Sequence, residues 1–421
     1  MFNKLLKNSF IYVLGDVLNK SIPFFMLPVL TRYLTPEDYG TIASFSALVS
    51  AFAVCSGLSV HGAVNVNFFR IGKEELKEYI GNTIIILNVS TLVIFAITFV
   101  VSPIIGEKLK LPTEWILIAV ILAFAQFLTT INLVLWTAEQ KPKQYTIYQL
   151  SQTLLFATLS LTFIVALKMD WKGQLIAQSI GTILFAGFSF LFIIKRGYLR
   201  FKMNREYISD ALKFGIPLIP HQLSMWLKTG SDRVILMSLV GSAETGIYSV
   251  SYQIGTVISV LVAAFNKAWS PYLYRVLSEE PKIETKLKLV NFTYIYMAAI
   301  VVIALLFSLS GKYLIPFFLG ERFASSMKYL VYFSMAFAFQ GMYCMVANYM
   351  FYAKKTNLIS YVTFTTSLLH VAMTYTFTKL YGSIGAAYST LISYFLTFIS
   401  IWYVSNKVYP MPWFFRIKSN Q

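Results

Sequence analysis

Residues 115–138 read WILIAVILAFAQFLTTINLVLWTA, a run of 24 residues without a single charged side chain. About 20 consecutive apolar residues are enough for an α-helix to span the hydrocarbon core of a bilayer. Runs of this kind recur along the chain, which has 421 residues, of which 57% are hydrophobic and only 13% are charged. A soluble protein carries roughly 25% charged residues. The composition therefore excludes a soluble multidomain enzyme and predicts an all-α integral membrane protein.

Twelve apolar stretches of spanning length, separated by polar breaks, can be distinguished. They fall at 10–30, 41–64, 81–102, 115–138, 147–167, 173–194, 214–232, 246–265, 289–310, 326–350, 357–378 and 384–404. The stretch at 214–232 is the weakest, because it contains Pro217, Pro220, His221, Lys228 and Asp232. The connecting segments are too short for an extramembrane catalytic domain. The sequence has no phosphate-binding loop, no His/Cys cluster and no supported catalytic set, so we predict neither an enzyme, nor a metal site, nor a cofactor.

The distribution of basic residues predicts the orientation of the chain. The sequence has 35 Lys and Arg against 18 Asp and Glu, a net charge of +17. With the N-terminus inside, 23 basic residues fall on the inner side, ten on the outer side, and Lys20 and Lys228 within spans. Cytoplasmic loops are enriched in Lys and Arg, so both termini are predicted to be cytoplasmic. The basic segment 195–213 is then expected to lie near anionic membrane lipid, and no nucleic-acid partner is expected.

The two halves of the chain resemble each other. Residues Pro36–Gly40, which precede one span, correspond at an offset of 206 to Ser242–Gly246, which precede another. The first span of each half carries two prolines, which are Pro23 and Pro28 in one and Pro217 and Pro220 in the other. Parallel repeats of this kind form transporters with the substrate path between the repeats. We therefore predict two six-helix bundles, residues 1–205 and 206–421, around a central cavity.

Four ionisable residues lie inside predicted spans. Asp16 and Lys20 are four residues apart in one span, and Lys228 and Asp232 are four apart in the equivalent span of the other half. Such a group at mid-membrane costs about 2.5–3.5 kcal/mol on insertion scales. The lysines could attract an anionic substrate, or each pair could neutralise itself; both interpretations remain open. We assign a substrate cavity to Lys20, Lys228, Arg70, Arg233, Tyr248 and Tyr252, and binding of a coupling ion, H⁺ or Na⁺, to Asp16, Asp232 and His221.

Several motifs resemble those of one family of membrane proteins. The first half carries KNSF at 7–10 and TRYLTPEDYG at 31–40, and the second carries FGIPLIP at 214–220 and GIYS at 246–249. This pattern resembles the polysaccharide transporter family, the Wzx-type flippases of bacterial O-antigen, capsule and exopolysaccharide biosynthesis. The resemblance covers the whole chain in length and number of spans.

The resemblance implies the fold of the multidrug/oligosaccharidyl-lipid/polysaccharide exporter superfamily. It also implies translocation of undecaprenyl-diphosphate-linked oligosaccharide from the inner to the outer leaflet of the bacterial inner membrane, by alternating access driven by an ion gradient. A polysaccharide polymerase and a chain-length regulator are the protein partners it suggests. The alternative is a multidrug or small-molecule antiporter of the same superfamily. Such antiporters favour acidic cavity groups, whereas Lys20 and Lys228 here balance the buried Asp residues.

Overall fold

The computed structural model describes residues 2–280 and 282–413. Both chain ends, and with them the predicted cytoplasmic termini, lie outside the described residues. Within the described residues all regular structure is helical. The helices group into two compact units, Met1–Ser249 and Val250–Gln421.

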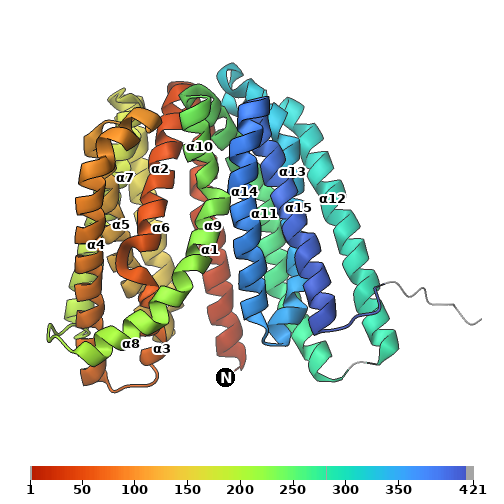
Figure 1. Ribbon diagram of the computed structural model, residues 1–421, viewed down its shortest axis with the longest axis horizontal. Helices are drawn as coiled ribbons and strands as arrows, with labels where there is room; N and C mark the ends of the chain where they lie inside the picture. The colour runs from red at the N-terminus through yellow and green to blue at the C-terminus, as the bar shows by residue number, and fades with distance from the viewer. Residues whose placement is uncertain (1, 281, 414–421) are drawn as a thin grey trace, which may run out of the picture. The chain divides into compact units, whose positions relative to one another are not determined.

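The first unit contains, within the described residues, ten α-helices and the beginning of an eleventh. Its helices are α1 (Phe2–Tyr33), α2 (Pro36–Cys55), η1 (Ser56–Ser59), α3 (His61–Asn67), α4 (Lys73–Leu109), α5 (Thr113–Ala138), α6 (Pro142–Leu161), η2 (Thr162–Ala166), α7 (Asp170–Lys195), α8 (Arg205–Gly215), η3 (Ile216–Leu218), α9 (Ile219–Thr229), α10 (Ser231–Leu239) and the first residues of α11 (Ser242–Ser278). Figure 1 shows α8 at the lower end of this unit and α10 at its upper end, joined by α9.

The second unit consists, in the part of the chain that the structure describes, of the rest of α11 and four further α-helices. These elements are α12 (Ile283–Leu319), η4 (Glu321–Ser326), α13 (Met327–Tyr352), α14 (Thr356–Tyr381) and α15 (Ser383–Val408). The sequence places the bundle boundary at residue 205, whereas the compact units divide after Ser249. They do so because α8 packs on α3 and α4, and because α9 and α10 pack on α2.

The predicted all-α membrane fold is confirmed. Nine helices in the described residues are long and apolar enough to cross a membrane. They are α2 with η1, α4, α5, α6 with η2, α7, α11, α12, η4 with α13, and α15. Of the other three predicted spans, α1 and α14 have the length but are not among these nine, and 214–232 is broken into short helices. α4, α11 and α12 each have 37 residues and are therefore about 55 Å long, more than a bilayer requires.

The break within 214–232 follows from its prolines and glycines. The short helix η3 begins at Ile216, directly before Pro217, and Pro220 stands at the start of α9. Proline has no N–H to donate to the preceding turn, so a continuous helix is interrupted here. Gly230 separates α9 from α10. The predicted single span is thus divided among the end of α8, η3, α9 and the start of α10.

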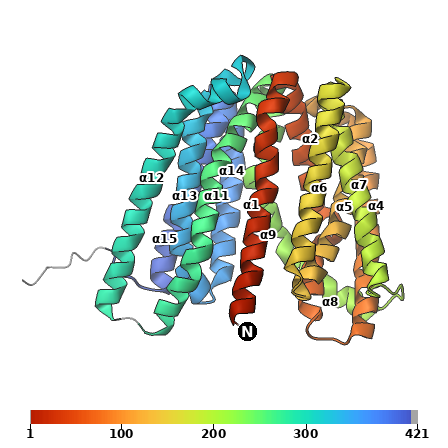
Figure 2. The same ribbon diagram turned by 180° about the vertical axis from the view of Figure 1, so that it is seen from behind.

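The outward surface of α4 is apolar, as expected for a helix that faces lipid. Leu92, Ile97 and Val100 are all more than half exposed. By contrast α5, which Figure 2 shows between α6 and α4, is the central helix of the first unit, and its Ile116, Leu122 and Ile131 are fully buried. A water-facing helix would not present so continuous an apolar surface. The exposed side of α4 is therefore the lipid side of the first unit.

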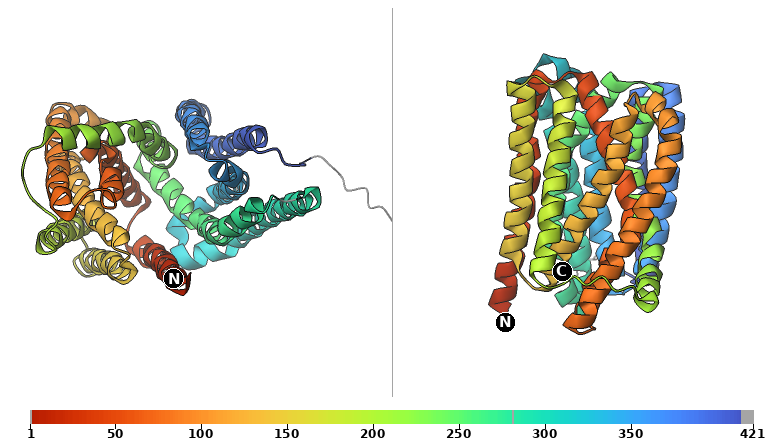
Figure 3. Two further views of the ribbon diagram at one scale, coloured as in Figure 1. Left: turned by 90° about the horizontal axis from the view of Figure 1, so that it is seen from below. Right: turned by 90° about the vertical axis from the view of Figure 1, so that its left-hand side faces the viewer.

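The segment after α7 is fastened to the beginning of α4. The side chain of the buried Asn82 donates to the Lys202 carbonyl (2.9 Å) and accepts from the Asn204 N–H (2.9 Å). The Arg200 N–H donates to the Lys77 carbonyl (3.1 Å). α8 follows and runs across the ends of the first unit's helices: seen from below in Figure 3, those helices appear end-on and α8 appears lengthwise.

Candidate substrate and ion site

The two repeat signatures meet each other in the first unit. α2 begins with a capping box in which the Asp38 N–H donates to the Thr35 hydroxyl (3.2 Å) and the Thr35 N–H donates to Asp38 (2.9 Å). Directly after it, a Cβ added to Gly40 would lie 1.9 Å from the Ser242 carbonyl oxygen. A Cβ added to Gly246 would lie 1.9 Å from the Pro36 carbonyl oxygen. Only glycine permits either approach.

This crossing is reciprocal. At the offset of 206, Gly246 is the counterpart of Gly40, and Ser242 is the counterpart of Pro36. Gly40 approaches Ser242 and Gly246 approaches Pro36, so the two contacts are equivalent. Mutual contact of equivalent residues is what a two-fold relation between repeats requires. The N-terminal ends of α2 and α11 therefore form a symmetric, close-packed crossing at one end of the unit.

Three predicted site residues come together next to this crossing. Asp232, in the first turn of α10, is fully buried and accepts a 2.5 Å hydrogen bond from the hydroxyl of the buried Tyr248 on α11. The guanidinium of Arg233 lies 6.0 Å from the centre of the Tyr248 ring. The N-terminus of a helix favours a negative charge, so the start of α10 suits a carboxylate. Each of the three residues was predicted as a site residue from the sequence, but the contacts between them were not predicted.

Lys228 and His221 lie on α9, one to three turns before Asp232. Lys228 is half-buried, and His221 is exposed. The indole N–H of Trp226 donates to the Ala47 carbonyl (2.9 Å) and so fixes α9 to the middle of α2. Lys228 therefore stands on a short helix that is held against α2 and bounded by a glycine on one side and prolines on the other. Such a segment can change its angle at its two ends.

Lys20 and Asp16 lie on α1, which packs against α6. The Thr153 hydroxyl of α6 donates to the Asn19 side chain, and this bond sets the rotation of α1. Asp16 is half-buried, and Lys20 is exposed. No ion pair joins Lys20 to Asp16 or to any other residue in the described ranges. The self-neutralising interpretation therefore does not describe this pair, and the charge of Lys20 is available to a ligand.

Arg70 and Tyr252 lie apart from the Asp232 group. Arg70 is exposed in the turn between α3 and α4, beyond the opposite end of α2 from the crossing. Tyr252 is one turn after Tyr248 on α11 but belongs to the second unit. There its ring packs edge-on against Phe333 (5.2 Å between centroids) and Phe337 (5.3 Å). Of the predicted site residues, Asp232, Arg233 and Tyr248 are thus the ones seen to form a cluster.

A partly buried polar network that was not predicted from the sequence lies where α5 ends, α6 begins and α7 ends. Arg196 pairs with Glu139 (3.3 Å), donates to Asn132 and lies over the Trp136 ring (5.1 Å). Burial alone would raise the pKa of Glu139, but hydrogen bonds from Lys141 and Tyr198 and the charges of Arg196 and Lys141 hold that pKa below its ordinary value. From the sequence, Arg196 is only one of the basic residues of the connecting segment 195–213, because nothing in the local pattern indicates that it folds back onto α5.

Comparison with known proteins gives matches that cover nearly the whole chain. A family model described as "Polysaccharide biosynthesis protein" matches residues 5–277. The chain is 27% identical over 411 residues to the Lsg locus putative protein 1 of Haemophilus influenzae, covering 94% of this chain and 98% of the relative. It is 23% identical over 425 residues to the capsular polysaccharide biosynthesis protein CapF of Staphylococcus aureus, covering 96% and 100%.

Two solved structures have a similar fold, each with a TM-score of 0.73 and 15% sequence identity. One is the inward-facing conformation of a multidrug resistance MATE family transporter of the MOP superfamily, covering 92% of this chain and 94% of that one. The other is the lipid II flippase MurJ in an inward closed conformation, covering 95% and 87%. These likenesses confirm the fold that the sequence motifs imply.

Proposed function

We propose that this chain, which belongs to the polysaccharide biosynthesis protein family, is a flippase for lipid-linked oligosaccharides. Its substrate is an undecaprenyl-diphosphate-linked repeat unit, which it moves from the inner to the outer leaflet of the bacterial inner membrane for assembly of a surface polysaccharide. The observation that carries the proposal is the family match over residues 5–277. The likeness to a lipid II flippase supports a fold that is suited to such a substrate.

The geometry of the first unit is consistent with alternating access. The Gly40–Gly246 crossing holds the N-terminal ends of α2 and α11 in backbone contact, which closes that end of the pair to a bulky head group. At the other end α9 is bounded by the Pro217–Pro220 break. Lys20 and Lys228 supply positive charge on α1 and α9 for a diphosphate. Opening of the crossing between α2 and α11 would then release the substrate on the side of the membrane opposite to the side from which it entered.

Deletion of the gene tests the proposed function. We expect the deletion strain to lose the surface polysaccharide and to accumulate lipid-linked oligosaccharide on the inner leaflet, because glycan synthesis continues while translocation stops. The measurement is surface glycan by immunoblot, together with extraction and mass analysis of the lipid-linked intermediates. Restoration by the plasmid-borne gene is the control. Unchanged surface glycan in the deletion strain would contradict the proposal.

The alternative function is export of a small molecule by an antiporter. It is favoured by one observation, the equal TM-score to a MATE family transporter. The same deletion strain distinguishes the two functions. An antiporter of cationic drugs would leave the surface glycan intact and would increase the sensitivity of the strain to such compounds.

Asp232 is proposed to bind the coupling ion. Its carboxylate is fully buried, lies in the first turn of α10 and has Tyr248 as a hydrogen-bond donor. In proteoliposomes with an imposed H⁺ or Na⁺ gradient, Asp232→Asn should abolish the stimulation of flipping by the gradient. Asparagine retains an oxygen that can accept from Tyr248 but carries no charge and takes up no proton. If Asp232→Asn responds to the gradient as the unmodified protein does, Asp232 has only a structural role.

A further inference from the structure

α8 has one face that is packed and one that is open. On the packed face Ala211 and Gly215 are buried, and a Cβ added to Gly215 would lie 2.2 Å from the Leu58 carbonyl oxygen. Asp210 accepts hydrogen bonds from the Tyr79 hydroxyl (2.8 Å) and the Asn67 amide (3.1 Å). These contacts with η1, α3 and α4 fix the rotation of α8 and therefore determine which side chains face outward.

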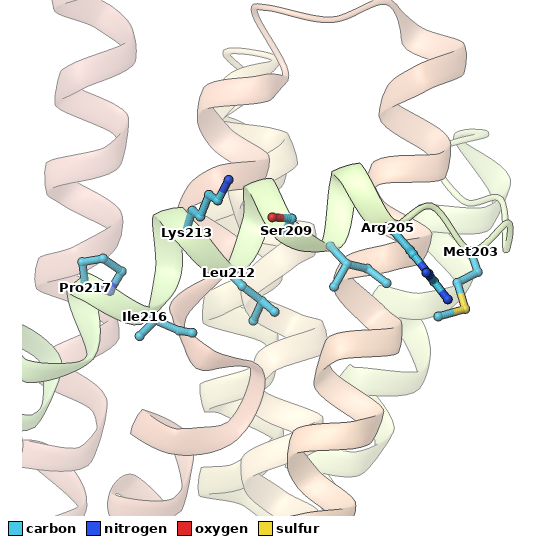
Figure 4. A pocket seen from close by; sticks show the side chains of 8 residues that line it. Met203, Arg205, Ser209, Leu212, Lys213, Ile216 and Pro217 are labelled. Atoms are coloured by element: carbon cyan, nitrogen blue, oxygen red, sulfur yellow. The ribbon is translucent and has the colours of Figure 1, made fainter.

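The open face forms a shallow groove of about 610 Å³. Its lining includes Met203, Arg205, Ser209, Leu212, Lys213 and Ile216, which Figure 4 shows along α8 and on the residues just before and after it. Arg205, Ser209, Leu212 and Ile216 recur at intervals of three and four residues, so they form one stripe. Met203 is 70% exposed and Ile216 49% exposed, although both are apolar. The groove thus combines exposed apolar side chains with two cations.

The cations of the groove are not neutralised by the described part of the protein. Neither Arg205 nor Lys213 has an ion pair with any residue in the described ranges, and the lining residues there include no acidic side chain. The preceding segment differs in this respect, because Arg200 (3.4 Å) and Lys202 (3.5 Å) both pair with Glu78. Among the basic residues of 195–213, Arg196, Arg200 and Lys202 have an ion pair within the described ranges, whereas Lys195 and the two groove residues Arg205 and Lys213 do not.

The position of α8 places this groove at a membrane surface. α8 packs on the first turns of α4 and follows α7 by a short segment that is hydrogen-bonded to α4. The apolar run of α4 begins at about residue 81, and α8 packs on the polar turns of α4 just before it, so α8 lies close to where the chain leaves the hydrocarbon. A helix with one basic and apolar face at this level lies in the interface and attracts anionic lipid.

We infer that the α8 groove binds an anionic phospholipid of the surrounding leaflet. Arg205 and Lys213 supply the positive charge for its phosphate, the Ser209 hydroxyl can donate to a phosphate oxygen, and Met203, Leu212 and Ile216 provide apolar surface for the upper part of its acyl chains. The inference is independent of what the protein transports, because it rests on a surface of the first unit that no residue of the proposed substrate or ion site lines.

Titration of the full-length protein with phosphatidylglycerol tests this inference. Native mass spectrometry in a neutral detergent would count bound lipid for the unmodified protein and for the double variant Arg205→Gln/Lys213→Gln. Each basic side chain near an anionic surface contributes enough that losing two should weaken binding about thirtyfold. Phosphatidylcholine, which has no net charge, should bind weakly to both proteins. Retention of phosphatidylglycerol binding by the double variant would overturn the inference.

The double variant Arg200→Gln/Lys202→Gln is the matched control. It removes the same charge a few residues away, but from side chains that already pair with Glu78, so it should keep near-normal affinity. An equal loss in the control would show that net charge alone attracts the lipid and would contradict a groove site. Competition with millimolar inorganic phosphate distinguishes the source of the phosphate. Displacement of the lipid by free phosphate would point to a simple anion site and would also overturn the proposal.

The apolar part of the groove has its own test. Met203→Ser/Ile216→Ser leaves the charges in place but removes the exposed apolar surface. It should weaken binding of long-chain phosphatidylglycerol and leave unchanged the weak binding of glycerophosphoglycerol, which has no acyl chains. Because all the exchanged side chains are exposed or partly exposed, a matching thermal unfolding midpoint is expected for each variant and verifies its fold. Equal affinity of this variant for long-chain lipid would contradict the role of the apolar stripe.

Discussion

Replacement of Gly40 by alanine is expected to stop export almost completely. The added methyl group would lie 1.9 Å from a backbone carbonyl oxygen, and no side-chain rotation can relieve that overlap. Overpacking of this kind costs about 1–3 kcal/mol or more. At the upper end of that range, the closed crossing of α2 and α11 would be depopulated about a hundredfold. The measurement is surface glycan in a deletion strain that carries the variant gene.

Gly187→Ala provides a matched control for this prediction. Gly187 also lies in a helix of the first unit, but apart from its chain neighbours and the nearby backbone of its own helix, no atom of the described residues lies within 4 Å of an added Cβ. Alanine should leave export unchanged there and should slightly favour the helix. Gly246→Ala, which meets the Pro36 carbonyl at the same distance, should reproduce the defect of Gly40→Ala. Normal export by Gly40→Ala at normal protein abundance would show that the crossing does not need to close this tightly.

Replacement of Lys20 or Lys228 by alanine is expected to lower export about tenfold or more. A hydrogen bond to a charged group contributes about 1.5–3 kcal/mol, and 1.4 kcal/mol corresponds to a factor of ten. Lys20 has no ion-pair partner in the described ranges, so its removal does not leave a carboxylate of the protein without its partner. Export rates of labelled lipid-linked oligosaccharide in proteoliposomes would measure the effect separately from protein abundance.

Replacement of either lysine by arginine should lower export less than replacement by alanine, because arginine keeps the positive charge and can pair with a phosphate. Lys143→Ala is a suitable control, since Lys143 is an exposed lysine in the first turn of α6. If alanine is tolerated at both Lys20 and Lys228 as well as at Lys143, the two lysines are not the diphosphate-binding groups. Loss at one position only would assign the role to that lysine alone.

The general fold could be predicted from the sequence, because membrane insertion requires long apolar runs that are visible without tertiary information. The ends of the helices were less predictable. The apolar run of 81–102 belongs to a helix that extends from Lys73 to Leu109, since the polar turns of a helix outside the bilayer have no apolar signal. The prolines of 214–232 indicated a weak span, but only the structure shows that the segment divides at Ile216 and Gly230.

The candidate site was predicted in part. Ionisable residues inside apolar runs are conspicuous, so Asp232 and Lys228 could be selected, and Tyr248 was assigned to the substrate cavity. Their pairing could not be predicted, because it depends on how α10 meets α11 in space. The α8 groove had only a compositional signal in the basic segment 195–213. Which of those charges are already paired, such as Arg200 and Lys202, depends on contact with Glu78 more than 120 residues earlier.

The mutual approach of Gly40 and Gly246 also bears on the ancestry of the gene. An ancestor that encoded one repeat and assembled as a pair of identical chains would have made both contacts with a single glycine codon, because equivalent residues meet across a two-fold axis. After duplication and fusion the same crossing depends on two separate codons. Each half can then diverge elsewhere, for example in its substrate-facing side chains, while the two glycines are retained together.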